Sequence, residues 1–148
     1  MSLRAPEVRD GGFLYGLIRD PSVRRYLGGP AVGTPEAVLA PYLTPGPGAA
    51  VWLVVAGAGP VGVISVTPHK DGRDHELSYQ FDPGAWGRGY ATEAAQAVLT
   101  AARAAGLARV IAETQAANAS SRALLARLGM GEIARLERFG ATQVIYGT

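Results

Sequence analysis

The sequence predicts an α+β (mixed α/β) domain, in which a sheet of six or seven strands carries helices on both faces. Two observations support this prediction. Extended patterns lie between residues 51 and 81, as β-branched runs at 51–56 and 61–67 and an apolar/polar alternation at 75–81, and a long Ala-rich helical pattern follows from residue 91. A third is the junction between these patterns, where glycines crowd into residues 81–94. We expect the rest of the chain to be organised around this junction.

Short elements are predicted before the sheet. Asp20 followed by Pro21, and Thr34 followed by Pro35, both match the pattern of a helix-capping residue with Pro at the first helical position. Apolar residues recur at spacings of three and four after each start and also after Asp10. The predicted N-terminal elements are an edge strand at residues 3–6 and helices at residues 10–20, 21–27 and 35–44.

The sheet pattern begins with a predicted meander of three antiparallel strands and continues with a βαβ unit. Glycine-rich turns separate the strands, and Gly106 and Gly129 are stop signals for the two later helices. A strand, a helix and a further strand in this order predict a right-handed crossover with parallel strands. The predicted elements are strands 51–56, 61–67, 75–81, 108–114, 130–137 and 142–146, a turn at 69–74, and helices 91–105 and 118–128.

Length and composition predict one domain spanning residues 1–148. The formal net charge is only +2, so no basic surface indicates nucleic acid as a partner. The sequence has no cysteine, which excludes thiolate nucleophiles and Cys-type metal sites and favours a reducing compartment. No apolar run approaches the roughly 20 residues that a membrane span needs. We therefore expect a cytoplasmic protein with no membrane partner.

The Gly-rich junction predicts a phosphate site. A strand that ends in such a loop and opens into a helix points several backbone N–H groups at one spot, where the helix dipole adds positive charge. Gly87 and Gly89 let a ligand approach this backbone without a Cβ in the way. A phosphorylated cofactor is the first expectation.

Two spaced motifs carry a family pattern. Residues 86–94 (WGRGYATEA) and 118–130 (NASSRALLARLGM) resemble the GNAT superfamily of acetyl-CoA-dependent N-acetyltransferases. Residues 20–27 (DPSVRRYL) resemble its RimJ/RimL-like branch, which acetylates ribosomal-protein N-termini. In the family's Gln/Arg-x-x-Gly-x-Gly/Ala loop, Trp86 replaces the first residue, while Gly89 and Ala91 fit. The resemblance implies the GNAT fold, acetyl-CoA as co-substrate and an amine as acceptor.

The resemblance also implies where coenzyme A would bind. Asn118 would hydrogen-bond the pantetheine arm, Ser121 would lie near the sulfur, and Arg88 and Arg122 are candidates for the nucleotide phosphates. The strand residues Tyr79, Gln80 and Phe81 would lie alongside pantetheine through their main chain. The pyrophosphate would be held by backbone N–H groups of Trp86, Gly87, Arg88, Gly89, Tyr90, Ala91 and Thr92.

Acetyl transfer to an amine needs a proton donor for the departing thiolate. Many GNAT enzymes place a Tyr four residues before the helix-ending Gly, and this position is Leu125 here. Ser121 is then the hydroxyl that the resemblance offers as the acid. It can equally be a residue of the first helical turn that helps Asn118 to cap the helix.

The amine must also lose a proton, because its pKa lies between about 8 and about 10.4. Glu76, on the polar side of the fourth strand, is our preferred base, and Glu113 on the fifth strand is the alternative. His75 points to the other side of the strand by parity. His69 belongs to a polar turn and is expected to be exposed.

Aromatic residues near the expected site have structural interpretations. Trp86 and Tyr90 are predicted to pack and to shape the loop, although the Trp ring could also form a wall beside the thioester. Trp52 and Phe139 are expected to fill the core, with a place in an acceptor pocket as the alternative.

The first function class is an enzyme that transfers acetyl directly from acetyl-CoA to an amine in a ternary complex. Two other function classes are alternatives to it. The missing Tyr favours an acyl-CoA-binding sensor or regulatory module of the same fold. A Rossmann-type oxidoreductase fails because Thr92 occupies the third Gly position of its fingerprint. The acceptor stays open between a protein N-terminus, an antibiotic and a metabolite amine, with specificity expected in loops 28–48 and 135–141. A monomer or homodimer without a metal is expected.

Overall fold

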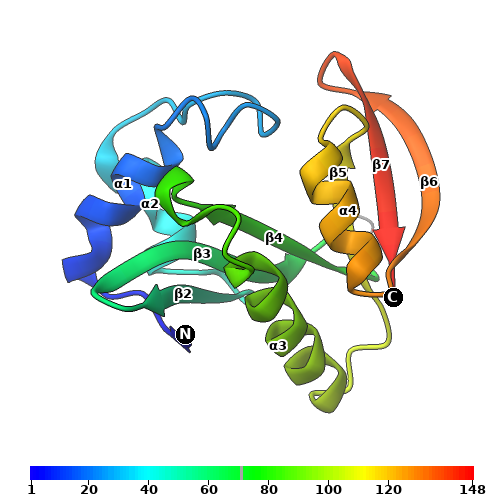
Figure 1. Ribbon diagram of the computed structural model, residues 1–148, viewed down its shortest axis with the longest axis horizontal. Coiled ribbons are helices and arrows are strands. Elements are labelled where there is room, and N and C mark those ends of the chain that lie inside the picture. Colours follow the sequence, from blue (N-terminus) through cyan, green and yellow to red (C-terminus); the bar gives the residue numbers. More distant parts are fainter. Residues whose placement is uncertain (71) are drawn as a thin grey trace.

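The computed structural model describes residues 1–70 and 72–148 and confirms the mixed α+β architecture (Figure 1). Seven strands form one sheet in the order β1-β2-β3-β4-β5-β7-β6. The strands are β1 Ser2–Arg4, β2 Ala50–Ala56, β3 Gly59–Pro68, β4 His75–Phe81, β5 Val110–Gln115, β6 Gly131–Arg138 and β7 Ala141–Gly147. The helices are α1 Gly11–Ile18, α2 Pro35–Leu43, α3 Tyr90–Ala104 and α4 Ala119–Arg127, with short 3-10 turns η1 Val8–Asp10 and η2 Pro83–Ala85.

Helices cover both faces of the sheet, and each face has its own core. The larger core joins α3 and α4 to the sheet and includes the fully buried Val54, Ile64 and Leu125. The smaller core packs α1 and α2 against β2 and β3, around Leu14 and Leu53. Because strand residues alternate between faces, neighbouring residues of β4 belong to different sides of the molecule.

The centre of the sheet opens between β4 and β5. These two strands are parallel, as the βαβ pattern predicts, but they pair only at His75 with Val110 and at Glu76 with Ile111. Beyond Glu76 the strands diverge (Figure 1), and β5 continues its pairing with β7 on the other side. The divergence leaves a gap in the middle of the sheet whose two edges are backbone.

One predicted helix is absent from the described chain. Residues 21–28 form hydrogen-bonded turns, although Asp20 does accept bonds from the N–H groups of Ser22 and Val23. The segment is short, and two glycines in the left-handed region, Gly28 and Gly29, end it before a second helical turn is complete. The prediction of a helix at 21–27 was therefore wrong, whereas its capping signal was read correctly.

The other predicted elements are confirmed to within two residues at their ends. Thr34 caps α2 by accepting a bond from the N–H of Ala37, and Asn118 caps α4 by accepting one from the N–H of Ser121. The predicted turn at 69–74 includes residue 71, which lies outside the described residues. Among the described helices, none has the length and hydropathy required to cross a bilayer.

Candidate active site

A tight loop follows β4 and leads into α3. The indole N–H of Trp86 donates to the carbonyl of Phe81 at 2.9 Å, and the Asp82 carboxylate accepts from the N–H of Gly84 at 3.1 Å. These bonds fold the chain back over the end of β4. Trp86 thus shapes the loop, as predicted, while half of its surface remains exposed.

The two glycines of the loop adopt conformations that side chains disfavour. Gly87 and Gly89 have φ of 77° and 80°, and a Cβ built on either would meet no other atom within 4 Å. Their backbone therefore faces open space, and Gly89 is the residue that precedes α3. The first N–H groups of a 15-residue helix point to this space without partners inside the helix. This geometry suits a diphosphate.

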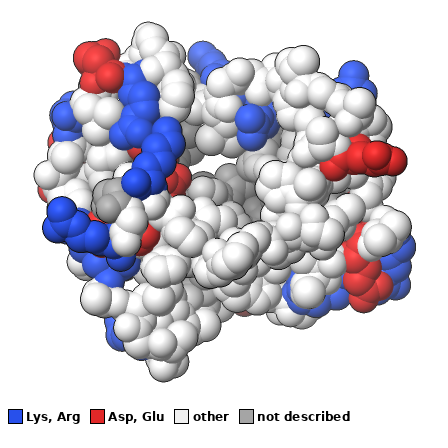
Figure 2. Space-filling model, turned by 180° about the vertical axis from the view of Figure 1, so that it is seen from behind, with Lys and Arg blue, Asp and Glu red and all other residues white. Residues whose placement is uncertain are grey.

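A cavity of about 960 Å³ begins at this loop and passes through the gap between β4 and β5. On the α3 and α4 side it is bordered by Tyr79, Asn118 and Ser121, and on the α1 and α2 side by Glu76 and Glu113. Figure 2 shows the molecule hollowed near the middle of the face seen from behind, with Lys and Arg side chains at the rim. The cavity is therefore lined by side chains from both faces of the sheet.

Two hydroxyl groups meet inside this cavity. The Tyr79 oxygen lies 2.5 Å from the Ser121 oxygen, and the backbone N–H of Ser121 is bonded to Asn118. Burial raises the pKa of Tyr79, partly offset by the hydrogen bond to Ser121. Leu125, at the position of the family's usual Tyr, is completely buried in the core and offers no hydroxyl group.

The predicted phosphate-binding arginines are placed differently from one another. Arg88 lies on the exposed loop beside the two glycines. Arg122 is engaged with the protein, donating to the Tyr146 hydroxyl at 3.1 Å and to the Ala116 carbonyl at 3.3 Å. Arg127, which was not among the predicted site residues, borders the cavity and donates to the Thr92 hydroxyl at 3.4 Å. Arg127 is therefore an additional candidate for the phosphates.

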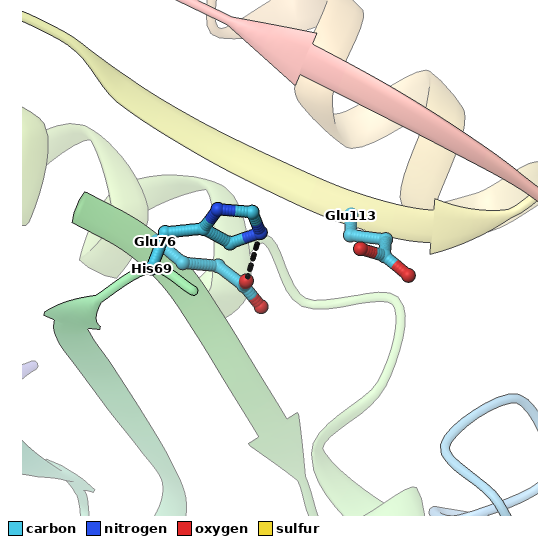
Figure 3. A group of neighbouring side chains, drawn as sticks. All are labelled: His69, Glu76 and Glu113. Carbon is cyan, nitrogen blue, oxygen red and sulfur yellow. Dashed lines mark ion pairs between the residues drawn. The ribbon is translucent and has the colours of Figure 1, made fainter. Parts of the chain in front are cut away.

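On the opposite face, three titratable side chains surround the gap (Figure 3). The His69 Nε2 lies 3.6 Å from the Glu76 carboxylate, and Glu113 forms an ion pair of 3.2 Å with Arg138. Burial raises the pKa of Glu76, and the charge of His69 works in the opposite direction. A carboxyl group with a raised pKa beside the gap has the properties of a general base.

His69 corrects one prediction. It was expected to be exposed, yet only 13% of its side chain is accessible because it lies at the start of β4, beside Glu76. Phe139 was expected to fill the core, but it lies at the β6–β7 turn with 75% of its surface exposed. Trp52 and Tyr90 do pack against the larger core, as expected.

His69, Glu76 and Glu113 also offer ligand atoms within 4.8 Å of one another, close enough to hold a metal ion. Arg138 already places a positive charge on Glu113, so a cation would have to compete with this ion pair. The donor set therefore fits a site for proton transfer better than one for a divalent ion.

Gln80 connects β4 to the N-terminal segments on the α1 and α2 side of the cavity. Its buried amide accepts a bond from Arg24 at 3.2 Å and donates one to the Tyr42 hydroxyl at 2.8 Å. Arg24 also holds the carbonyls of Leu27 and Gly29. The turn at 21–28 and α2 are thereby fixed to β4, where they line the cavity.

Comparison with known proteins defines the family. The model of the acetyltransferase (GNAT) domain matches residues 1–131, so the chain belongs to the GNAT acetyltransferase family. Membership makes it an acetyl-CoA-dependent N-acetyltransferase, which confirms that part of the expectation. A search of the curated proteins finds no match to the sequence.

Solved structures show the same fold. A GNAT-family acetyltransferase from Bacillus anthracis has 24% identity and a TM-score of 0.82, over 99% of this chain and 92% of that one. A spermidine N-acetyltransferase from Vibrio cholerae, in complex with CoA and spermine, has 18% identity, the same coverage and a TM-score of 0.82. The aminoglycoside acetyltransferase AAC(6')-Ib, in complex with coenzyme A, has 12% identity over 99% and 93% of the two chains, with a TM-score of 0.82.

Proposed function

We propose that this protein transfers the acetyl group of acetyl-CoA to a primary amine by direct attack within a ternary complex. The observation that carries the proposal is the cavity that runs through the sheet, with the Gly-rich loop at one end and Glu76 near the other. Each substrate then has its own entrance, and the two meet at the gap between β4 and β5. No nucleophilic side chain is needed for this reaction.

The residues near the gap supply what direct attack requires. The loop from Trp86 to Thr92 would hold the pyrophosphate through its backbone N–H groups. Glu76 would take the proton of the incoming ammonium, directly or through one water, and its raised pKa brings it closer to the pKa of an amine. A backbone N–H at the diverging edge of β4 would stabilise the negative charge on the carbonyl oxygen.

The acceptor is a protein N-terminus or a small amine. Residues 20–27 favour the RimJ/RimL-like branch and hence a protein terminus, and the turn that they form borders the acceptor side of the cavity. Structural neighbours are described in complex with spermine and with ribostamycin, which are polyamine and aminoglycoside ligands. All three kinds of acceptor present a primary amine, so we propose the primary amine as the common requirement.

A second candidate function is a sensor that binds acyl-CoA without turnover. The buried Leu125 favours it, because the side chain at this position provides no acid. The two functions differ in whether the thioester is cleaved when an amine is present.

The test measures thiol release from acetyl-CoA with a panel of N-terminal peptides, polyamines and aminoglycosides. The protein contains no cysteine, so every thiol that appears comes from coenzyme A. We expect saturable release with at least one amine, and mass spectrometry should find the acetyl group on the amine nitrogen. Tight binding of acetyl-CoA without release across the panel would contradict the proposal and support the sensor.

A further inference from the structure

The hydroxyl pair of Tyr79 and Ser121 has a chemical property that neither residue has alone. Tyr79 comes from β4 and Ser121 from the first turn of α4, so the pair bridges two elements across the cavity. Two hydroxyl groups carry two protons, and the bond between them uses only one. The second proton is available to a third group in the cavity.

Both members of the pair are held in place. Ser121 is fixed by the capping bond from its N–H to Asn118, and Tyr79 packs against the larger core. The strands β4 and β5 diverge after Glu76. Tyr79 lies three residues further along β4, so its side chain is on the opposite face of the strand from that of Glu76. The hydroxyl pair therefore faces the thioester side of the gap, and the proposed base faces the amine side.

We propose that Tyr79 and Ser121 together form the proton donor for the departing thiolate, an inference that rests on the proposed function. The amine nitrogen bonds to the carbonyl carbon, the C–S bond breaks, and its electron pair goes to sulfur. Ser121 passes its proton to sulfur and receives the proton of Tyr79. The tyrosinate regains a proton from solvent, and Glu76 releases the proton that it took from the amine.

The surroundings of Tyr79 suit this role. Burial raises its pKa, so the phenol keeps its proton at neutral pH and can donate it. The thiol of the product has a pKa of about 8.5, so at neutral pH the departing sulfur takes up a proton and leaves as the thiol. The completely buried Leu125 leaves the position of the usual acid without a hydroxyl group, and the pair supplies one from a different strand.

The inference is tested first without turnover, by titrating the thiol of bound coenzyme A. The alkylation rate of this thiol against pH gives its pKa, and the protein contributes no thiol of its own. Hydrogen bonds to the thiolate favour the charged form, so Tyr79→Phe and Ser121→Ala should each raise the pKa of the bound thiol by about one unit. Tyr15→Phe, in α1, is the matched control and should leave that pKa unchanged.

Kinetics supply the second readout. Tyr79→Phe should lower kcat by about tenfold to a hundredfold with little change in KM for acetyl-CoA. The loss should shrink with an acetyl thioester of a more acidic thiol, since that leaving group needs less help. The double variant should lose no more than the larger single loss, because the two hydroxyls act in series.

Two results would overturn the inference. One is a bound thiol whose pKa is the same in Tyr79→Phe and Ser121→Ala as in the unchanged protein. The other is a loss in kcat that is independent of the leaving group. Because the titration needs only bound coenzyme A, its result stands whether or not the protein acetylates an amine, so failure of the inference is distinguishable from failure of the proposed function.

Discussion

The imidazole of His69 lies 3.6 Å from the carboxylate of Glu76, beside the gap where β4 and β5 separate. The hairpin register creates this proximity, since Thr67 of β3 stands opposite Glu76 near the start of β4 and His69 follows two residues later. Burial raises the pKa of Glu76 and His69 moderates the increase. We therefore expect His69 to influence the pH at which the proposed base, Glu76, loses its proton.

We expect Glu76→Gln to lower kcat/KM by about a hundredfold or more, because the amide cannot accept the proton of the ammonium. A base works in its deprotonated form, so the acid limb of kcat/KM should lie above the ordinary carboxyl value of 4.5 and should be lost in the variant. A pH series with the best acceptor measures both effects. Glu36→Gln, on the exposed start of α2, is the control, and an acid limb that survives in Glu76→Gln would assign the base elsewhere.

His69→Asn should move the same acid limb to higher pH. His69 is the strongest of the cations that lower the pKa of Glu76, so without it that pKa rises further and a higher pH is needed to deprotonate the carboxyl group. The measurement is the pH profile of kcat/KM for the variant beside that of the unchanged protein. An unmoved limb would show that His69 does not act on Glu76.

Gln80→Leu should loosen the acceptor side of the cavity. The substitution leaves Tyr42 and Arg24 without their shared partner, which should lower the free energy of unfolding by about 1–3 kcal/mol. We expect KM for the amine to rise while the Kd for coenzyme A stays constant, as measured by steady-state kinetics and calorimetry. Equal losses for both substrates would contradict the assignment of Gln80 to the acceptor side.

Arg127→Gln should weaken the binding of coenzyme A and reduce its salt dependence, since Arg127 borders the cavity next to Thr92. Binding of pantetheine, which lacks phosphate, should not change. Arg122→Gln is the comparison, because the resemblance assigns the phosphates to Arg122 while the structure engages it with Tyr146. A larger loss in Arg122→Gln than in Arg127→Gln would favour the resemblance.

Gly62→Ala tests the close approach of β3 to the end of β4. A Cβ at Gly62 would lie 2.5 Å from the Phe81 ring and 2.8 Å from the Gln80 carbonyl oxygen, so the strands must shift to admit it. We expect a loss of about 1–3 kcal/mol in denaturant unfolding. Gly12→Ala, in α1 with nothing within 4 Å, should instead stabilise by about 0.5–1 kcal/mol.

The sequence predicted those parts of the candidate site whose structure depends on residues adjacent in the chain. Glycines, a period change and a capping Asn were enough to place the loop at 86–92 and the start of α4, because each depends on residues adjacent in the chain. The fold followed from the same patterns. The turn at 21–28 shows the limit, since its helix start signal was overridden by the glycines that follow it.

The contacts between distant residues could not be predicted in this way. His69 meets Glu76 through the hairpin register. The Tyr79 and Ser121 hydroxyls, 42 residues apart in sequence, meet because α4 packs against β5, the strand next to β4. Arg127 approaches Thr92 only through the packing of α4 against α3. The register of the hairpin was a usable signal for His69, whereas the other two pairs depend on helix placement.

The most direct test of diphosphate binding by the backbone N–H groups uses calorimetry. It compares the affinity for coenzyme A of Gly89→Glu with that of Gly106→Glu. Gly89 and Gly106 flank α3, share a left-handed φ of 80° and 87°, and both face open space, so the two substitutions impose the same backbone strain. We expect Gly89→Glu to weaken binding at least about tenfold, because the added carboxylate occupies the anion site, and Gly106→Glu to bind normally. Equal affinity in the two variants would contradict a diphosphate site at the start of α3.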